Sequence, residues 1–190
     1  MNTLLASLWI LAAYLWGGVL PAEWIVRRMT GRAPEDWGDN PGGAGTFRLA
    51  GWRAATLVVA FDLLKGALPV IVAERAGWGL PWVALAAAAP VAGHNWPLQR
   101  RFRPGGKGLA AALGAVLYLG WPGSVPAYLL GLLAVWRGRW APWMGLVALP
   151  LTLGWMITQG YGVPRLWACA LIGILLVVRQ IPWLREKMGK

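Results

Sequence analysis

The dominant feature of the chain is a series of long apolar runs separated by short basic loops. Of its 190 residues, 58% are hydrophobic and only 13% are charged, which is fewer charges than a soluble domain of this size carries. The runs are rich in Leu, Ala and Val, and they lack the period of two that barrel strands would show. We therefore expect an all-α fold, a polytopic transmembrane helix bundle that forms one domain over residues 1–190.

The lengths of the apolar runs predict about seven membrane spans, since a helix needs ~20 apolar residues to cross a bilayer and fewer where its flanks adapt. The expected spans cover residues 4–25, 53–73, 80–97, 108–121, 124–136, 141–158 and 163–182. The fourth and fifth are short. They leave an alternative open, a broken hairpin or a re-entrant unit that is split at Trp121-Pro122-Gly123.

The Lys and Arg residues are distributed unevenly between the loops. Most of the 18 lie in loops 26–52, 98–107 and 137–140 and in the C-terminal tail, which seven spans would place on one side. Because Lys and Arg accumulate in cytoplasmic loops, we expect the N-terminus outside, the C-terminus in the cytoplasm and the chain in the cell membrane. The net charge of +11 then indicates membrane lipids or phosphates as partners and no nucleic acid, because the charges lie in short loops.

Two cytoplasmic loops have the composition of an anion site. The loop 37–48 reads Trp-Gly-Asp-Asn-Pro-Gly-Gly-Ala-Gly-Thr-Phe-Arg. Its backbone N–H groups could form an anion-binding nest, and Arg48 could pair with a phosphate through two hydrogen bonds. The alternative is a flexible turn between helices.

The segment 93–108 reads Gly-His-Asn-Trp-Pro-Leu-Gln-Arg-Arg-Phe-Arg-Pro-Gly-Gly-Lys-Gly and ends where an apolar run begins. Glycines let the backbone approach an anion closely, and a helix N-terminus adds unpaired N–H groups. Lys107 suits phosphate contact at this position. His94 is either a base, a hydrogen-bonding residue or a structural residue, and the whole segment could instead only fix topology.

Two ionisable residues lie inside the second apolar run. Asp62 and Lys65 are spaced i, i+3 and share one face of a helix. Charged groups at membrane depth cost about 2.5 kcal/mol or more each, so they are usually paired and functional. Lys65 could point toward the site with Asp62 as its counter-ion, or the two could form a purely structural pair.

The chain has one Cys, Cys169, and one His, His94. An internal disulfide and an ordinary zinc site are therefore excluded, and we expect neither a metal nor a cofactor.

Four segments taken in order resemble the bacterial acyl-phosphate:glycerol-3-phosphate acyltransferase family, a group of small integral membrane enzymes. Residues 17–21, Gly-Gly-Val-Leu-Pro, stand where the family has a Gly-Ser-rich segment. Loop 37–48 is similar to the family's Gly-Ser-Gly-Asn-Pro-Gly-Ala-Thr-Asn and following Arg. Residues 62–66 match Asp-x-x-Lys-Gly, and segment 93–108 is similar to Gly-His-x-x-Pro and Phe-Lys-Gly-Gly-Lys-Gly. The resemblance covers roughly residues 10–118, and the last third only by hydropathy.

The chain departs from the family pattern at several polar positions. The family's Ser, Ser, Gly, Thr and Asn fall at Gly18, Gly38, Asp39, Ala44 and Gly45. One extra residue separates His94 from Lys107. The family's C-terminal segment, similar to Arg-His-Arg-Glu-Asn-Ile, is reduced to Arg-Gln-Ile at 179–181.

The resemblance implies transfer of a fatty acyl group from acyl-phosphate to glycerol 3-phosphate, which gives lysophosphatidic acid in phospholipid biosynthesis. The residues expected at the catalytic centre are His94, Lys107 and Asn40. The residues expected to bind substrate phosphates are Arg48, Gly42, Lys65, Gly105, Gly106 and Gly108, and Asp62 is expected to orient Lys65. The partners are then acyl-phosphate, glycerol 3-phosphate and membrane lipids, while the oligomeric state stays open and includes a monomer.

Two alternatives remain open at this point. One is a diverged paralogue that uses a different phosphorylated acceptor or donor, which the lost polar side chains favour. The other is a non-catalytic membrane protein that binds anionic lipid, or a small transporter. A transporter would show internal repeats with paired broken helices, and the sequence shows no such repeat.

Overall fold

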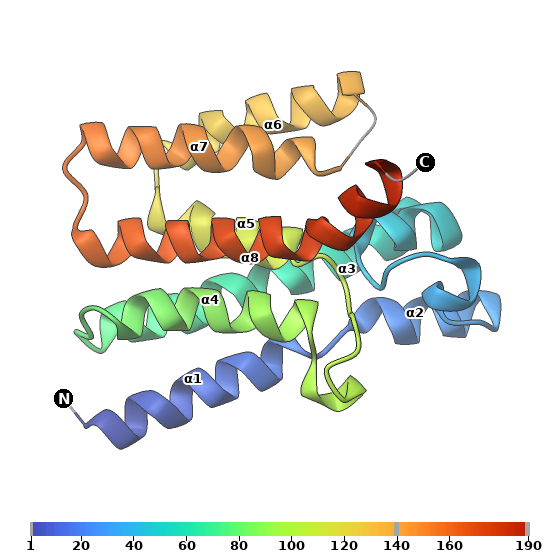
Figure 1. Ribbon diagram of the computed structural model, residues 1–190, viewed down its shortest axis with the longest axis horizontal. Coiled ribbons are helices and arrows are strands. Elements are labelled where there is room, and N and C mark those ends of the chain that lie inside the picture. The colour runs from blue at the N-terminus through green and yellow to red at the C-terminus, as the bar shows by residue number, and fades with distance from the viewer. Residues whose placement is uncertain (1, 139–140, 189–190) are drawn as a thin grey trace.

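The computed structural model describes residues 2–138 and 141–188, with side chains described as far as residue 181. These residues form eight α-helices and two 3₁₀ turns (Figure 1). The elements are α1 (Thr3–Gly17), α2 (Pro21–Thr30), η1 (Pro34–Trp37), α3 (Gly43–Arg75), α4 (Trp82–Asn95), η2 (Leu98–Arg100), α5 (Leu109–Leu119), α6 (Ser124–Gly138), α7 (Trp143–Thr158) and α8 (Val163–Met188). The predicted all-α bundle is confirmed. Arg139, Trp140 and Lys190, which belong to the predicted basic loops and tail, lie outside the described residues.

The N-terminal quarter differs from the prediction. The expected first span over 4–25 is broken, because α1 ends at Gly17 and α2 begins at Pro21. Proline suits the first position of a helix, where its missing N–H is not needed, so Pro21 starts a new helix and does not continue the first one. The expected loop 26–52 is also largely helical, since it contains part of α2, η1 and the first turns of α3.

Helix α3 begins ten residues before the predicted span and is kinked at Gly51, whose φ of 81° lies outside the helical region. The later helices match the predicted spans closely, and α5 and α6 are two separate helices. The segment between these two helices contains the predicted break at Trp121-Pro122-Gly123.

Some of the helices are apolar and long enough to cross a membrane. Three stretches of the described chain qualify by length and composition alone: Thr3–Thr30, taken through its break, Gly43–Arg75 and Val163–Ile181. Helices α5 and α7 are shorter apolar helices. Leucines on α6 point outward, with Leu129 62% and Leu132 54% exposed, as expected for side chains that face lipid.

Small residues bring the central helices close together. Helix α3 packs along α5, and a Cβ at Gly66 or Gly114 would overlap the backbone of the facing helix at Ala111 or Leu63. Membrane helices associate through such small residues because lipid gives them no hydrophobic driving force. Helix α4 lies between α1 and α8, while α6 and α7 pack mainly against each other.

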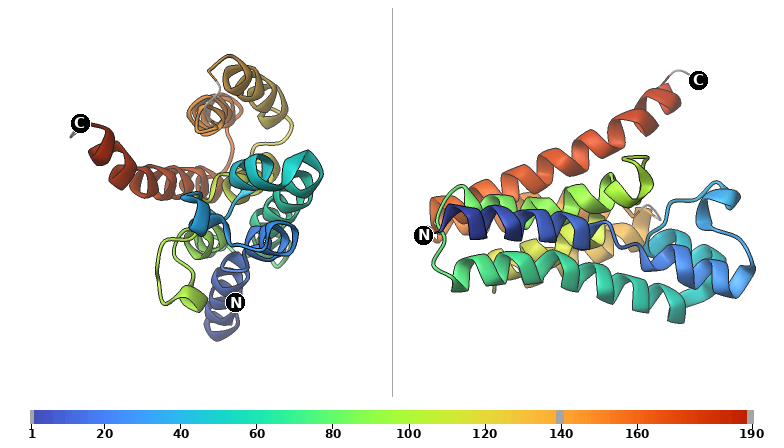
Figure 2. Two further views of the ribbon diagram at one scale, coloured as in Figure 1. Left: turned by 90° about the vertical axis from the view of Figure 1, so that its right-hand side faces the viewer. Right: turned by 90° about the horizontal axis from the view of Figure 1, so that it is seen from below.

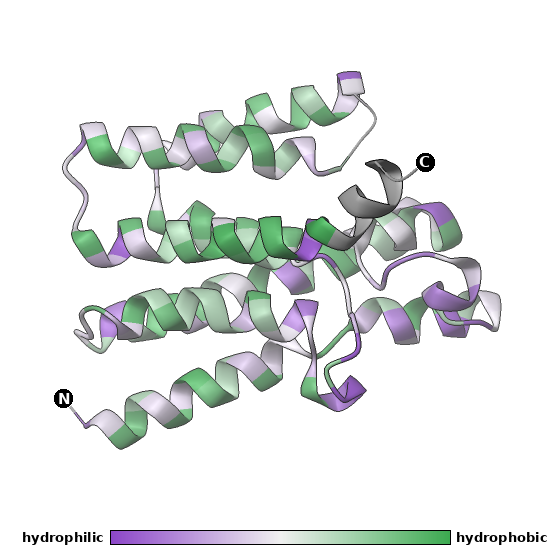
Figure 3. Ribbon diagram, viewed as in Figure 1, coloured by the Kyte–Doolittle hydropathy of each residue, from purple (hydrophilic) through white to green (hydrophobic). Residues whose placement is uncertain are grey.

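The bundle has two distinct ends, with the chain termini at opposite ones (Figures 1 and 2). Polar residues gather around α2, η1 and η2 at the end near the C-terminus, whereas the helices between the ends are mostly apolar (Figure 3). We call these the C-terminal end and the N-terminal end of the bundle. The predicted site loops lie at the C-terminal end.

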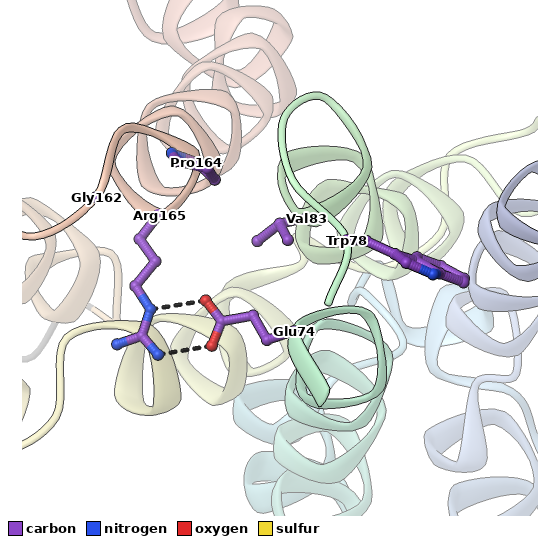
Figure 4. Close-up of a pocket in the computed structure, with 6 residues that line it drawn as sticks. All are labelled: Glu74, Trp78, Val83, Gly162, Pro164 and Arg165. Carbon is purple, nitrogen blue, oxygen red and sulfur yellow. Dashed lines mark hydrogen bonds and ion pairs between the residues drawn. The ribbon is translucent and has the colours of Figure 1, made fainter. Parts of the chain in front are cut away.

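At the N-terminal end, an ion pair joins the last turn of α3 to the first turn of α8 (Figure 4). Arg165 donates from Nε and Nη2 to the two carboxylate oxygens of Glu74, at 2.7 and 2.6 Å. Tyr118 Oη also donates to Glu74, at 3.0 Å, and Arg165 Nη1 reaches the carbonyl of Leu119 at 3.2 Å. The pair therefore joins three helices.

Candidate active site

The two predicted site loops meet at the C-terminal end of the bundle. Gly106 lies so close to His94 that a Cβ on this glycine would overlap Nε2 of the imidazole. The same Cβ would lie 2.9 Å from the carbonyl oxygen of Pro41 in the other loop. Gly106 is thus required by the close approach of three segments, which are the end of α4, the loop before α3 and the loop before α5.

The Gly-Gly-Lys-Gly loop is fixed by hydrogen bonds from both sides. The Gly105 N–H donates to the carbonyl of Asn95 at 2.9 Å. On the other side, Arg179 of α8 donates from Nη2 to Gly105 O and from Nε to Gly106 O, both at 3.0 Å. Arg179 is only 9% exposed, so its charge contributes to the site while its hydrogen bonds shape the loop.

The first turn of α3 provides a second group of donors. Gly42, the N-cap residue, has no side chain to accept hydrogen bonds from the first-turn N–H groups. The positive end of the helix dipole also lies here. Arg48, one and a half turns along, pairs with Asp39 through Nε to Oδ2 at 2.8 Å and Nη2 to Oδ1 at 2.6 Å. The arrangement is that of an anion site with a carboxylate beside it.

Lys107 is influenced by charged groups near both loops. Partial burial lowers the pKa of its ammonium group, and the neighbouring Arg179 charge lowers this pKa further. Asp39 acts in the opposite direction and Arg48 in the same direction as Arg179. The charges of Arg179, Asp39 and Arg48, from different parts of the chain, therefore all act on Lys107.

A buried polar group lies behind the loops. Lys65 Nζ is 2.7 Å from Asp62 Oδ1 and donates to the carbonyl of Val19 at 2.9 Å, in the break between α1 and α2. His94 Nδ1 lies 3.6 Å from the same Asp62 oxygen. Lys65 is fully buried, so its ammonium reaches these two acceptors and affects the loops through its charge. The side chains of Lys65, Asp62 and His94 therefore lie in a row that runs from the break between α1 and α2 to Gly106.

A partly buried arginine links the polar segments at the same end. Arg100 of η2 lies 2.9 Å from Glu23 of α2 and 2.5 Å from Glu35 of η1. Because α2 and η1 lead into the loop before α3, and η2 leads into the loop before α5, this bridge sets how far apart the two site loops lie.

All ten predicted site residues lie at this end of the bundle. These are Asn40, Gly42, Arg48, His94, Gly105, Gly106, Lys107 and Gly108, with Asp62 and Lys65 behind them. Sequence reasoning did not assign a role to Arg179 or Arg100, and it did not predict the pairing of Arg48 with Asp39. The sequence signals for Arg179 were a charged residue late in the last apolar run and its place in the segment 179–181, which stands where the family has its C-terminal motif.

At one position where the chain lacks the family's polar residue, another side chain fills the space. The space beside Gly18, where the family has Ser, is filled by the side-chain amide of Gln99. Gln99 Nε2 donates to the carbonyl of Leu15 at 2.9 Å, near the end of α1. A polar side chain from another segment therefore occupies the place of the missing hydroxyl.

Comparisons with known proteins agree with one another. A family model described as glycerol-3-phosphate acyltransferase matches residues 7–188. A glycerol-3-phosphate acyltransferase of Azotobacter vinelandii is 40% identical over 148 residues, which cover 76% of this chain and 78% of the relative. The crystal structure of PlsY, an integral membrane glycerol 3-phosphate acyltransferase, in its glycerol 3-phosphate form has a TM-score of 0.80 and 26% identity, and covers 97% of this chain and 92% of PlsY. Its lysophosphatidic acid form has a TM-score of 0.77 and 27% identity at the same coverage.

Proposed function

Because the chain belongs to the glycerol-3-phosphate acyltransferase family, we propose that it transfers a fatty acyl group to glycerol 3-phosphate and forms lysophosphatidic acid for phospholipid biosynthesis. The observation that carries this proposal is the meeting of two glycine-rich loops around Arg48, Lys107 and Arg179. Such a cationic site at the end of an apolar bundle suits substrates that have phosphate groups and an acyl chain.

We propose acyl-phosphate as the acyl donor. The 1-hydroxyl oxygen of glycerol 3-phosphate attacks the acyl carbon, an ester C–O bond forms, and the C–O bond to phosphate breaks. Inorganic phosphate leaves, and the hydroxyl proton passes to it or to water. A mixed anhydride is already activated, so the chain needs no nucleophile of its own. N–H and cationic groups near the carbonyl would stabilise the developing oxyanion.

The two loops divide the phosphates between them in this proposal. Lys107 holds one phosphate, together with the backbone of residues 105–108, while Arg48 and the first turn of α3 hold the other. Asn40 and Gly42 shape the second loop. His94 faces Gly106 and would hydrogen-bond a phosphate or the acceptor hydroxyl. Its Nδ1 lies 3.6 Å from Asp62, and the Lys65 ammonium that pairs with Asp62 adds positive charge.

We further propose that this site faces the cytoplasm in the cell membrane. Hydrophilic residues gather around α2, η1 and η2 at the C-terminal end (Figure 3). The loops there, 26–52 and 98–107, carry many of the Lys and Arg residues, and such residues favour the cytoplasmic side. The N-terminus then lies outside. Water-soluble phosphorylated substrates would reach the site directly from the cytoplasm.

A second candidate is acyl transfer to a different phosphorylated acceptor. Asp39 favours it, because a carboxylate pairs with Arg48 where the resembling family has glycine. This candidate keeps the chemistry and changes the acceptor.

The test is release of inorganic phosphate by the purified protein in detergent, given palmitoyl-phosphate with and without glycerol 3-phosphate. Release that requires glycerol 3-phosphate, with lysophosphatidic acid formed, supports the proposal. Folded protein that releases no phosphate with glycerol 3-phosphate, but does so with another phosphorylated acceptor, would replace it with the second candidate.

A further inference from the structure

Asp39 places a carboxylate at the second anion site of the chain. Its Oδ1 accepts a hydrogen bond from the Asn40 N–H at 2.9 Å. A Cβ on Gly45 would lie only 3.0 Å from the same oxygen, so the carboxylate rests against the first turn of α3. This is the end of the helix at which an anion is stabilised by N–H groups and by the dipole.

The carboxylate uses the same donors that a phosphate would use. Arg48 presents Nε and Nη2 to the two oxygens of Asp39. An arginine fork binds carboxylate and phosphate in the same two-bonded way, so one arginine cannot offer these two donors to both. Occupation of Arg48 by Asp39 and by a substrate phosphate are alternatives.

The two partners differ in how firmly they are held. The Asp39 side chain is 15% exposed and that of Arg48 is 60% exposed. Asp39 is fixed by its neighbours, whereas Arg48 lies at the surface and can turn away. An exposed pair contributes little to stability, so an incoming anion can displace it. The pair has the properties of a contact that opens during binding.

We propose that Asp39 is a built-in competing anion, which the phosphate of a substrate must displace from Arg48. The inference rests on the proposed function and adds a determinant of substrate affinity and specificity to it. A phosphate with two negative charges displaces the carboxylate more readily than a singly charged anion does. Asp39 thereby raises the KM for the substrate whose phosphate binds at Arg48 and disfavours monoanions.

The test is the variant Asp39→Asn, which removes the charge and keeps the shape of the side chain. We expect the KM for one of the two phosphorylated substrates to fall about two- to fivefold, the range that an exposed ion pair accounts for, with kcat unchanged. The substrate whose KM falls is the one that binds at Arg48. The matched control is Asp36→Asn in η1, where the new amide oxygen can still accept the Ala33 N–H; it makes the same change in charge and should leave both KM values as they are.

Binding of inorganic phosphate separates this inference from the proposed function, because it needs no turnover. Phosphate should raise the melting temperature of Asp39→Asn at a lower concentration than it does for the wild type or Asp36→Asn. If Asp39→Asn binds phosphate more weakly, or has a raised KM, then Asp39 positions Arg48 and the inference is wrong. If phosphate binding tightens while no acyl transfer to glycerol 3-phosphate occurs in any variant, the inference holds and the proposed acceptor is wrong.

Discussion

The two ends of the bundle each contain an arginine that pairs with a carboxylate through two hydrogen bonds. Glu74 and Arg165 are joined at 2.7 and 2.6 Å, and Asp39 and Arg48 at 2.8 and 2.6 Å. The distances are nearly equal. The surroundings are not, since the Arg165 side chain is 32% exposed and that of Arg48 is 60% exposed.

The surroundings decide what each pair does. Arg165 also bonds the carbonyl of Leu119 and lies over the rings of Tyr118 and Tyr161, while Tyr118 bonds Glu74. Several partners hold that pair in one arrangement, and it locks three helices. The pair at the C-terminal end lies beside the unpaired N–H groups of a helix, where another anion can replace the carboxylate. Two ion pairs with nearly equal distances therefore differ in function: the pair of Glu74 and Arg165 stabilises the helix packing, and the pair of Asp39 and Arg48 can be displaced by another anion.

The largest expected effect is at the C-terminal end. Lys107→Ala removes the charge between the two loops, and we expect kcat/KM to fall about 100-fold or more, the scale of losing one preorganised donor to developing charge. Acyl transfer and thermal unfolding should be measured on the same preparation. Arg53→Ala, which removes an exposed charge from α3, is the control and should stay active. Full activity of a folded Lys107→Ala protein would contradict the assigned site.

The next effect is at the N-terminal end and concerns stability. Glu74→Gln leaves the Arg165 charge without its counter-ion in a partly buried position, and we expect a loss of about 2 kcal/mol, or a melting temperature lower by about 5 °C. The double variant Glu74→Leu, Arg165→Leu should recover part of the loss, because replacing both partners costs less than removing one. If Glu74→Gln changes a KM at temperatures where the variant is folded, the N-terminal ion pair also affects substrate binding and does not act on stability alone.

A smaller effect is expected from the bridge at Arg100. Arg100→Ala separates η2 from Glu23 and Glu35, and the two site loops should become less well aligned. We expect KM to rise about fivefold, equivalent to about 1 kcal/mol for a partly exposed network. Arg103→Ala, an exposed arginine in the same loop, is the comparison. Equal effects of the two variants would mean that only total charge matters.

The smallest effect is a shift of the pH profile. Lys107 attracts phosphate only while it is protonated, and its pKa lies below the ordinary 10.5 because of burial and the Arg179 charge. Activity should therefore fall as the pH rises through the pKa of Lys107. This fall should occur at a lower pH than it would if the lysine were exposed. Lys107→Arg keeps its charge throughout this range, so its alkaline limb should move to higher pH. If the alkaline limb of the pH profile is the same in Lys107→Arg and the wild type, a group other than Lys107 titrates there.

The sequence predicted the fold of the central and C-terminal helices because each of them corresponds to a long apolar run. It did not predict α2 and η1, which are short and polar and lack the length of a span. Local signals were nevertheless present, with Pro21 at the first position of α2 and Gly31 in the left-handed conformation after its end. A search for spans alone passes over such helices.

The loops of the site could be found from composition, since glycine-rich basic segments are visible in the sequence. Their mutual arrangement could not. Arg179 lies more than seventy residues from the two carbonyls that it binds, and only tertiary packing brings it there. The pairing of Asp39 with Arg48 likewise depends on the turn before α3 and on Gly45 in the first turn of α3, which leaves room for the carboxylate.

The most direct test of the account compares Asp39→Asn and Glu74→Gln side by side, by the melting temperature and the KM for both phosphorylated substrates. The account predicts that Glu74→Gln lowers the melting temperature and leaves both KM values unchanged. It predicts that Asp39→Asn lowers one KM and leaves the melting temperature nearly unchanged. If both variants change the same quantity in the same direction, the two pairs do not have different functions and the account is contradicted.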